Sequence, residues 1–244
     1  MIIGVNGIQL YYTKTGHGRP LIMLHGNGED HTIFDEAVGV LKEHFTCYCV
    51  DSRGHGQSSP CKELHYKDMA ADMIAFMSEL DLYDAAFYGF SDGGIAALLA
   101  AMDCSRITNL VVSGANITTK GTTLPFRLFL KVSSLGKYDP LIELMKNEPD
   151  IPPAELSRIR VKTLVTAGSR DLIRESETRL IAESIPNARL MILKGENKGI
   201  LRLDGKTKIG KVLDDGLEHE EFYPSKDSIY ETVDRLYSLV PVEE

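Results

Sequence analysis

Residues 88–94 read Tyr-Gly-Phe-Ser-Asp-Gly-Gly, and this stretch decides the fold class of the chain. It follows the apolar run Ala85–Tyr88, typical of a buried strand, and precedes Ile-Ala-Ala-Leu-Leu-Ala, typical of a helix. A serine on a sharp strand-to-helix turn needs small residues two positions before and after it, where Gly89 and Gly93 stand. The pattern predicts a reactive Ser91 hydroxyl at a helix N-terminus, which favours developing negative charge. The competing interpretation is a plain glycine-rich turn with an exposed serine.

On both sides of this turn, short apolar runs alternate with longer stretches of helical period, which indicates a parallel sheet with crossover helices. Two N-terminal strands, Ile2–Val5 and Gln9–Thr13, are expected to form a hairpin that turns at Asn6-Gly7. We therefore predict an α/β fold with a mostly parallel, eight-stranded sheet and helices on both faces. The expected buried strands are Leu21–Leu24, Thr46–Val50, Ala85–Tyr88, Leu110–Ser113, Thr163–Ala167 and Arg189–Leu193.

Two amphipathic patterns predict helices that pack on this sheet. Met69, Met73, Met77 and Leu80 fall on one helical face, which indicates core packing rather than a cofactor site. A closing helix is expected where Ile229, Val233, Leu236 and Val240 repeat the pattern. The 244 residues suit one domain, 1–244, that folds without disulfides or metals.

Two segments interrupt the alternation. Residues 116–157 are long for a simple connection between strands, and such connections are usually functional lids or binding loops. This lid segment contains apolar residues that favour an acyl or alcohol pocket: Leu124, Phe126, Phe129, Leu130, Leu135, Tyr138 and Leu141. Residues 199–217 contain Asp204-Gly205, a two-residue hairpin signal, and are expected to form an inserted hairpin.

The composition excludes several classes of partner. A net charge of −8 with no clustered Lys and Arg argues against nucleic acid. No apolar run is long enough to span a bilayer and no signal-peptide pattern opens the chain, so we expect a cytoplasmic protein with no membrane partner. Four cysteines lack metal-ligand spacing, and Cys47 and Cys49 are expected as small core residues of a reducing compartment. No metal or organic cofactor is predicted.

A second glycine-rich turn follows the strand Leu21–Leu24 and reads His25-Gly-Asn27-Gly28. Acyl transfer develops an oxyanion that needs two donors, which are commonly backbone N–H groups. The N–H groups of Asn27 and of Asp92, the residue after Ser91, form the natural pair. Alternatively, His25-Gly26 merely ends a strand.

Three motifs together resemble the α/β-hydrolase family, in its bacterial esterase/lipase-like branch. They are His25-Gly-Asn-Gly28, Asp51-Ser-Arg-Gly-His-Gly-Gln-Ser58 and Gly89-Phe-Ser-Asp-Gly93, and the resemblance extends to about Leu193. It implies an α/β-hydrolase fold with Ser91 as nucleophile. The second motif is a structural turn in that family, so Arg53 and His55 receive no catalytic role. A serine at position 91 argues against epoxide hydrolases and haloalkane dehalogenases, which use aspartate there.

The resemblance also implies an acid and a base. Asp171 matches the family's acid, in the Gly168-Ser-Arg-Asp171 turn after a strand, although it could instead cap the following helix. The family's histidine position reads Gly195-Glu-Asn-Lys198 and so holds a lysine. His219 is the only histidine after Asp171 and lies in a second match, Gly216-Leu-Glu-His219. His219 is the predicted base, and two alternatives stay open: catalysis by Lys198, or loss of the base.

The sequence therefore predicts a serine hydrolase that cleaves a small carboxylic ester through an acyl-serine intermediate. Its predicted triad is Ser91, Asp171 and His219, and its predicted oxyanion hole is formed by Asn27 and Asp92. Amide, thioester and carbon–carbon bond hydrolysis stay open as reactions. The alternative of a different class is a non-catalytic member of the fold that binds a small ligand.

Overall fold

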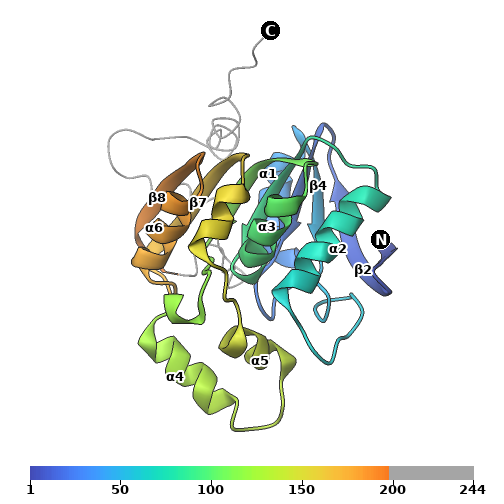
Figure 1. Ribbon diagram of the computed structural model, residues 1–244. Coiled ribbons are helices and arrows are strands. Elements are labelled where there is room, and N and C mark those ends of the chain that lie inside the picture. Colours follow the sequence, from blue (N-terminus) through green and yellow to red (C-terminus); the bar gives the residue numbers. More distant parts are fainter. Residues whose placement is uncertain (198–244) are drawn as a thin grey trace.

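A computed structural model describes residues 1–197, with side chains through Leu193 (Figure 1). The predicted insertion 199–217 and the predicted closing helix lie outside the described residues. An eight-stranded sheet in the order β1-β2-β4-β3-β5-β6-β7-β8 forms the centre of the domain. Strand β2 pairs with β1 on one side and with β4 on the other, both antiparallel. All the remaining neighbouring pairs, from β4-β3 to β7-β8, are parallel. The strands are β1 Ile2–Val5, β2 Ile8–Thr15, β3 Arg19–Leu24, β4 Phe45–Val50, β5 Ala85–Phe90, β6 Ile107–Ser113, β7 Lys162–Arg170 and β8 Ala188–Asn197.

The predicted fold class is confirmed, and every predicted strand is present, the first with the predicted bounds and the others with wider ones. The N-terminal hairpin turns at Asn6 and Gly7, whose φ angles of 46° and 79° are those of a two-residue hairpin turn. The helices are α1 Asp35–Leu41, α2 Tyr66–Glu79, α3 Asp92–Asp103, α4 Leu124–Ser133, α5 Pro140–Asn147 and α6 Glu175–Ser184, with 3-10 turns η1 His31–Phe34, η2 Thr119–Gly121 and η3 Pro153–Arg158.

The sheet separates two apolar cores because alternate residues of each strand point to opposite faces. On one face, Ile22 and Leu24 of β3 join the large core under α2, α3 and α6. On the other, Leu21 and Met23 join a smaller core with α1. Figure 1 shows α2, α3 and α6 in front of the sheet and α1 behind it.

The methionines and cysteines behave as the sequence predicts. Met69, Met73 and Met77 are buried on α2 in the large core. Cys47 and Cys49 are buried together in the smaller core. Burial raises the pKa of both thiols to about 12, so they remain protonated at neutral pH. All four cysteines are free thiols.

Residues 116–157, hereafter the cap segment, connect β6 to β7 and carry α4 and α5 (Figure 1). A narrow neck closes this segment, because Thr118 forms a β-bridge with Asp150 and the Ile151 N–H donates to the Ile117 carbonyl at 2.8 Å. Beside the neck, Thr122 bridges Ile173 of the loop after β7. The two helices thus extend from the sheet as one unit. No helix among residues 1–197 is long and apolar enough to cross a membrane.

The neck is held by one buried carboxylate. Glu177 of α6 is 5% exposed, and its Oε1 accepts the N–H groups of Ile117 and Thr118 at 3.0 and 2.8 Å and the Thr118 hydroxyl at 3.1 Å. Its side chain lies directly against Gly121, where a Cβ would be 2.2 Å from Cδ. A helix on the sheet therefore fixes the entry of the cap segment.

Replacing Glu177 with alanine is expected to destabilise the protein by about 2–4 kcal/mol, because two N–H groups lose their shared acceptor. The matched control is Glu175→Ala on the same helix, whose carboxylate forms only a half-exposed pair with Arg179 and should cost about 0–1 kcal/mol. Urea unfolding followed by circular dichroism measures both. Equal losses in the two variants would contradict the anchoring role of Glu177.

Candidate active site

Ser91 lies between β5 and α3 in a strained backbone conformation, with φ 53° and ψ −116°. Its N–H donates to the Ser113 carbonyl at 2.8 Å, which ties the turn to the end of the neighbouring strand β6. Its carbonyl accepts the N–H groups of Gly94 and Ile95 and so begins the helix. The predicted strand–turn–helix arrangement around Ser91 is present, and the side chain sits at the positive end of the α3 dipole.

Glycine is required beside Ser91 because backbone segments meet there. A Cβ on Gly93 would lie 2.2 Å from the Leu24 carbonyl oxygen and 2.6 Å from that of His25. A Cβ on Gly26 would lie 3.0 Å from Cβ of Ser91. The end of β3 and the start of α3 therefore approach each other closely, and the His25–Gly28 turn lies beside Ser91.

The predicted oxyanion residues are neighbours. The Asn27 side-chain amide donates to Oδ2 of Asp92 at 2.9 Å and to the Leu141 carbonyl of α5 at 3.3 Å. Buried Tyr66 also hydrogen-bonds the Asp92 carboxylate, and burial together with that negative charge raises the pKa of Tyr66 well above its usual value. Asp92 is the first residue of α3, where a backbone N–H has no acceptor within the helix. These contacts fix the turn that would present the two N–H groups.

Asp171 follows β7 at the same edge of the sheet and is 9% exposed. A Cβ on Gly114, the residue after β6, would lie 3.3 Å from its Oδ2. Its Oδ1 accepts the Ile173 N–H at 3.0 Å. Helix α6 begins only at Glu175, with Arg174 as its N-cap, so the alternative reading of Asp171 as a helix cap is wrong. The carboxylate instead shapes its own loop and remains the predicted acid.

The predicted base cannot be placed, because His219 and Lys198 both lie outside the described residues. Within residues 1–197, no side chain hydrogen-bonds the Ser91 hydroxyl. Three histidines near the motif turns have other partners: His25 contacts the Gly26 carbonyl, His31 contacts Asp51, and His55 contacts the Arg53 carbonyl. Among the side chains described, residues 1–193, none is placed as a base for Ser91, and His219 stays a prediction.

His25 has a structural role that the sequence did not reveal. Its ring is 1% exposed, with Nδ1 2.8 Å from the Gly26 carbonyl and Nε2 accepting the Ser52 N–H at 3.0 Å. These partners assign the neutral ring with its proton on Nδ1. Burial lowers the pKa of His25 to about 4. His25 therefore joins the turn after β3 to the turn after β4 as a neutral imidazole.

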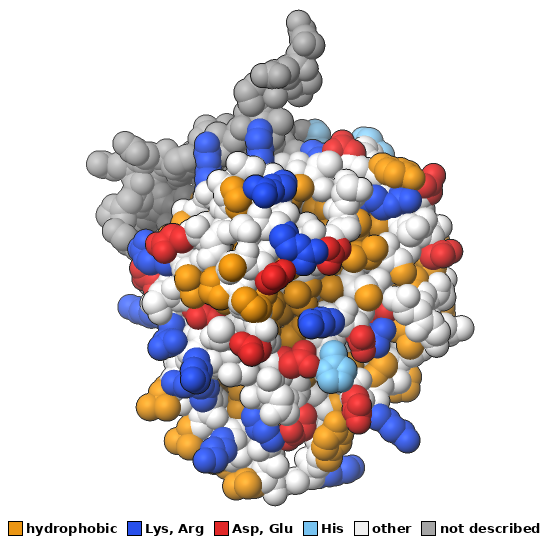
Figure 2. Space-filling model, viewed as in Figure 1, with side chains coloured by type: hydrophobic (Ala, Val, Ile, Leu, Met, Phe, Trp, Pro, Cys, Tyr) orange, Lys and Arg blue, Asp and Glu red, His pale blue; other side chains and the backbone are white. Residues whose placement is uncertain are grey.

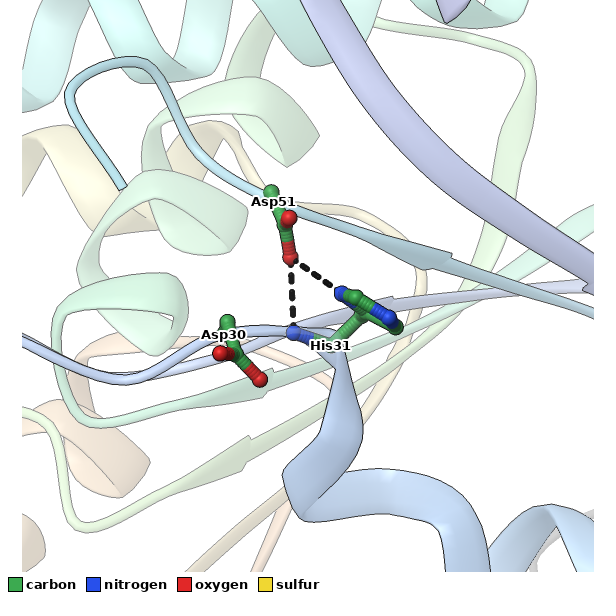
Figure 3. Close-up of side chains that lie close together, drawn as sticks. All are labelled: Asp30, His31 and Asp51. Carbon is green, nitrogen blue, oxygen red and sulfur yellow. Dashed lines mark hydrogen bonds and ion pairs between the residues drawn. The ribbon is translucent and has the colours of Figure 1, made fainter. Parts of the chain in front are cut away.

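The Asp51–Ser58 motif is a hydrogen-bonded turn, as the resemblance implies. Buried Asp51 accepts the backbone N–H and Nδ1 of His31, both at 2.7 Å, and the Gln57 N–H at 2.8 Å. Figure 3 shows the two bonds to His31 and the neighbouring Asp30. Arg53 forms a two-pronged ion pair with buried Asp72, at 2.6 and 2.7 Å. Neither Arg53 nor His55 contacts Ser91.

Asp30, His31 and Asp51 offer ligand atoms within 4.8 Å of one another, which is the one such group among the described residues. Their polar atoms have protein partners, however. Asp51 accepts the three N–H groups named above, and Oδ1 of Asp30 accepts the N–H and hydroxyl of Thr32 at 2.9 and 2.5 Å. We interpret the cluster as the hydrogen bonding that holds the loop before η1 against β4.

Four of the seven cap-segment residues expected to favour an apolar pocket are exposed instead. Leu124, Phe129, Leu135 and Tyr138 are each more than half exposed, whereas Leu130 is buried. The reason is that α4 packs through the side that carries Leu130 and turns its other apolar side outward. The expected apolar acyl pocket is therefore not formed by these four side chains.

Because neutral His25 is protonated when the chain unfolds, acid should destabilise the protein through this residue. Its contribution is complete above pH 6.5 and is lost as the pH falls towards about 4. Between pH 7.5 and 4.5 the loss should be about 2–3 kcal/mol. Urea unfolding at both pH values should show a fall smaller by that amount in His25→Asn than in wild type. Parallel pH dependence in the two proteins would contradict the assignment.

Comparisons with known proteins agree with this architecture. The sequence profile of the alpha/beta hydrolase fold family matches residues 19–139. The AB hydrolase superfamily protein YisY of Bacillus subtilis is 27% identical, over 96% of this chain and 94% of its own length. Mouse (Mus musculus) serine hydrolase BPHL is 26% identical, over 88% of this chain and 85% of its own.

A solved structure has the same fold. The crystal structure of the enol-lactonase from Burkholderia xenovorans LB400 superimposes with a TM-score of 0.69 at 21% identity, covering 90% of this chain and all of that one. The sheet order, the strained serine turn and the family profile lead to one conclusion. This chain belongs to the α/β-hydrolase superfamily.

Proposed function

We propose that this member of a hydrolase family cleaves a small carboxylic ester through an acyl-Ser91 intermediate. The observation that carries the proposal is the strained, glycine-flanked Ser91 at the N-terminus of α3, beside the Asn27 turn. Strain of this kind costs of order 1–3 kcal/mol and clusters at functional sites. Packing alone gives no reason to keep a serine there.

In the proposed reaction, His219 takes the Ser91 proton while Oγ attacks the ester carbonyl. The N–H groups of Asn27 and Asp92 stabilise the oxyanion. The alcohol leaves with the proton from His219, and water, activated by the same histidine, then releases the acid and restores Ser91. Asp171 would orient the imidazole and stabilise its charged form. The serine hydrolase name of the mouse relative supports this class of chemistry.

A second candidate is a member of the fold that binds a small ligand without turnover. One observation favours it: the sequence has a lysine, Lys198, at the family's histidine position. The two candidates differ in whether Ser91 is activated. That difference can be measured without knowledge of the natural substrate.

Labelling with a fluorophosphonate, which reacts with activated serines, and hydrolysis of a short-chain p-nitrophenyl ester form the test. Wild type should react in both assays. Ser91→Ala and His219→Ala should lose turnover by about 10⁴-fold or more, as triad knockouts do. Lys198→Ala should retain it, and so should Ser157→Ala, an exposed serine on η3 that serves as the control.

The outcomes separate the candidates. If wild type is labelled but does not hydrolyse the ester, Ser91 is an activated nucleophile and the proposed ester substrate is wrong. Unlabelled, inactive wild type would favour the ligand-binding protein. Loss of activity in Lys198→Ala, with His219→Ala unaffected, would assign the base to the lysine.

A further inference from the structure

Helix α4 turns an apolar face away from the domain. Leu124, Leu128 and Val132 follow one another at four-residue spacing and so share one side of the helix. Leu135, just past its end, continues that line. Their exposed fractions are 69%, 59%, 59% and 81%, while Leu130 on the opposite side is buried. With Phe129, these exposed residues form what we term the α4 outer face.

Such a surface is unusual for a soluble domain. Single exposed apolar side chains are ordinary, but contiguous ones mark interaction sites. Phe129 stacks on Phe126 with ring centroids 6.2 Å apart and is still more than half exposed. The other large apolar side chains that are exposed among the described residues, such as Ile2 and Tyr83, lie on other elements. The α4 outer face thus concentrates apolar surface in one place.

The stretch of chain that carries this face is positively charged, whereas the whole protein is negatively charged. The chain carries a net charge of −8, yet residues 104–138 contain no Asp or Glu. Within that stretch, Lys120, Arg127, Lys131 and Lys137 surround or follow α4. None of the four forms an ion pair with another described residue. Figure 2 shows basic and apolar side chains side by side at the end of the molecule that α4 occupies in Figure 1.

We propose that the α4 outer face docks on the surface of an anionic phospholipid bilayer. An amphipathic helix with apolar residues and flanking cations lies in the plane of the lipid interface, with its apolar side among the acyl chains. Each cation near the surface adds attraction to anionic headgroups. The prediction of no membrane partner rested on the lack of an apolar run long enough to span a bilayer. Docking on the bilayer surface needs no such run.

A second copy of this chain fits the face less well. Two copies joined through α4 would bring two sets of unpaired cations together, and juxtaposed like charges oppose association. An anionic surface neutralises them. This argument uses only the surface and does not depend on the proposed ester hydrolysis, so failure of one leaves the other standing.

Co-sedimentation with phosphatidylcholine vesicles, with and without phosphatidylglycerol, tests the proposal on the full chain. Wild type should sediment with the anionic vesicles, more weakly as salt rises, and poorly with the neutral ones. Leu128→Glu should weaken binding at least tenfold. Its matched control is Ile2→Glu, an apolar residue 64% exposed on β1, which should bind as wild type.

A second pair of variants tests the charge. Lys131→Gln with Lys137→Gln should weaken binding to anionic vesicles about 25-fold, from about fivefold for each cation. Lys42→Gln with Lys162→Gln removes the same charge from the residue after α1 and from the first residue of β7, at the edge of the sheet where the parallel strands begin, and should have little effect. Equal binding to both vesicle types, or equal effects of the two pairs, would overturn the proposal. The proposal would also be overturned if the protein bound neither type of vesicle and formed a dimer that Leu128→Glu dissociates.

Discussion

The contact between the start of α3 and the end of β3 is the constraint on which the site depends. Gly93 lies so close to the carbonyl groups of Leu24 and His25 that no side chain fits between them. This approach sets the His25–Gly28 turn beside Ser91 and lets the Asn27 amide reach Asp92. The central strands, which are covered on both faces, thus place the two turns side by side. The strain at Ser91 persists because the surrounding core fixes it.

A layer of buried polar groups supports those turns from the side. Neutral His25 joins the turns after β3 and β4, and Asp51 holds the loop that leads into η1. Polar groups buried this deeply are tolerated because each finds a partner, and leaving one unpaired would be costly. The same residues that look reactive in the sequence are therefore committed to structure. Arg53, paired with Asp72, is the clearest case.

The sequence predicts the sheet well because its strands are short apolar runs bounded by turn residues. A parallel strand that is buried on both faces must be almost entirely apolar. The Ser91 turn was predictable for a related reason: glycine at positions 89 and 93 is a local requirement of the backbone. Helix α4 was harder. Its periodicity identifies an apolar side but not whether that side meets the domain, because this depends on packing far away in the chain. Leu124 and Leu135 were expected in a pocket and face outward instead.

Asp171 illustrates a second limit. The stretch after it has helical character, but α6 begins four residues later, and only the three-dimensional loop shows its carboxylate accepting the Ile173 N–H. Its proximity to Gly114 comes from the pairing of β6 with β7, a contact between segments more than fifty residues apart. The structure does not test the prediction that His219 is the base, because His219 lies outside the described part of the chain.

The neck of the cap segment has a consequence for how this protein can diverge. Both strands of the neck are fixed by backbone pairing and by Glu177, none of which involves α4 itself. Substitutions, insertions or an exchanged α4 beyond the neck would leave the sheet and the Ser91 turn in place, whereas the Asn27 turn also depends on the Leu141 carbonyl of α5. The cap segment is therefore attached to the sheet through its neck. Relatives can therefore acquire new specificity there while inheriting the nucleophile turn unchanged, which makes α4 and α5 the natural target for directed evolution.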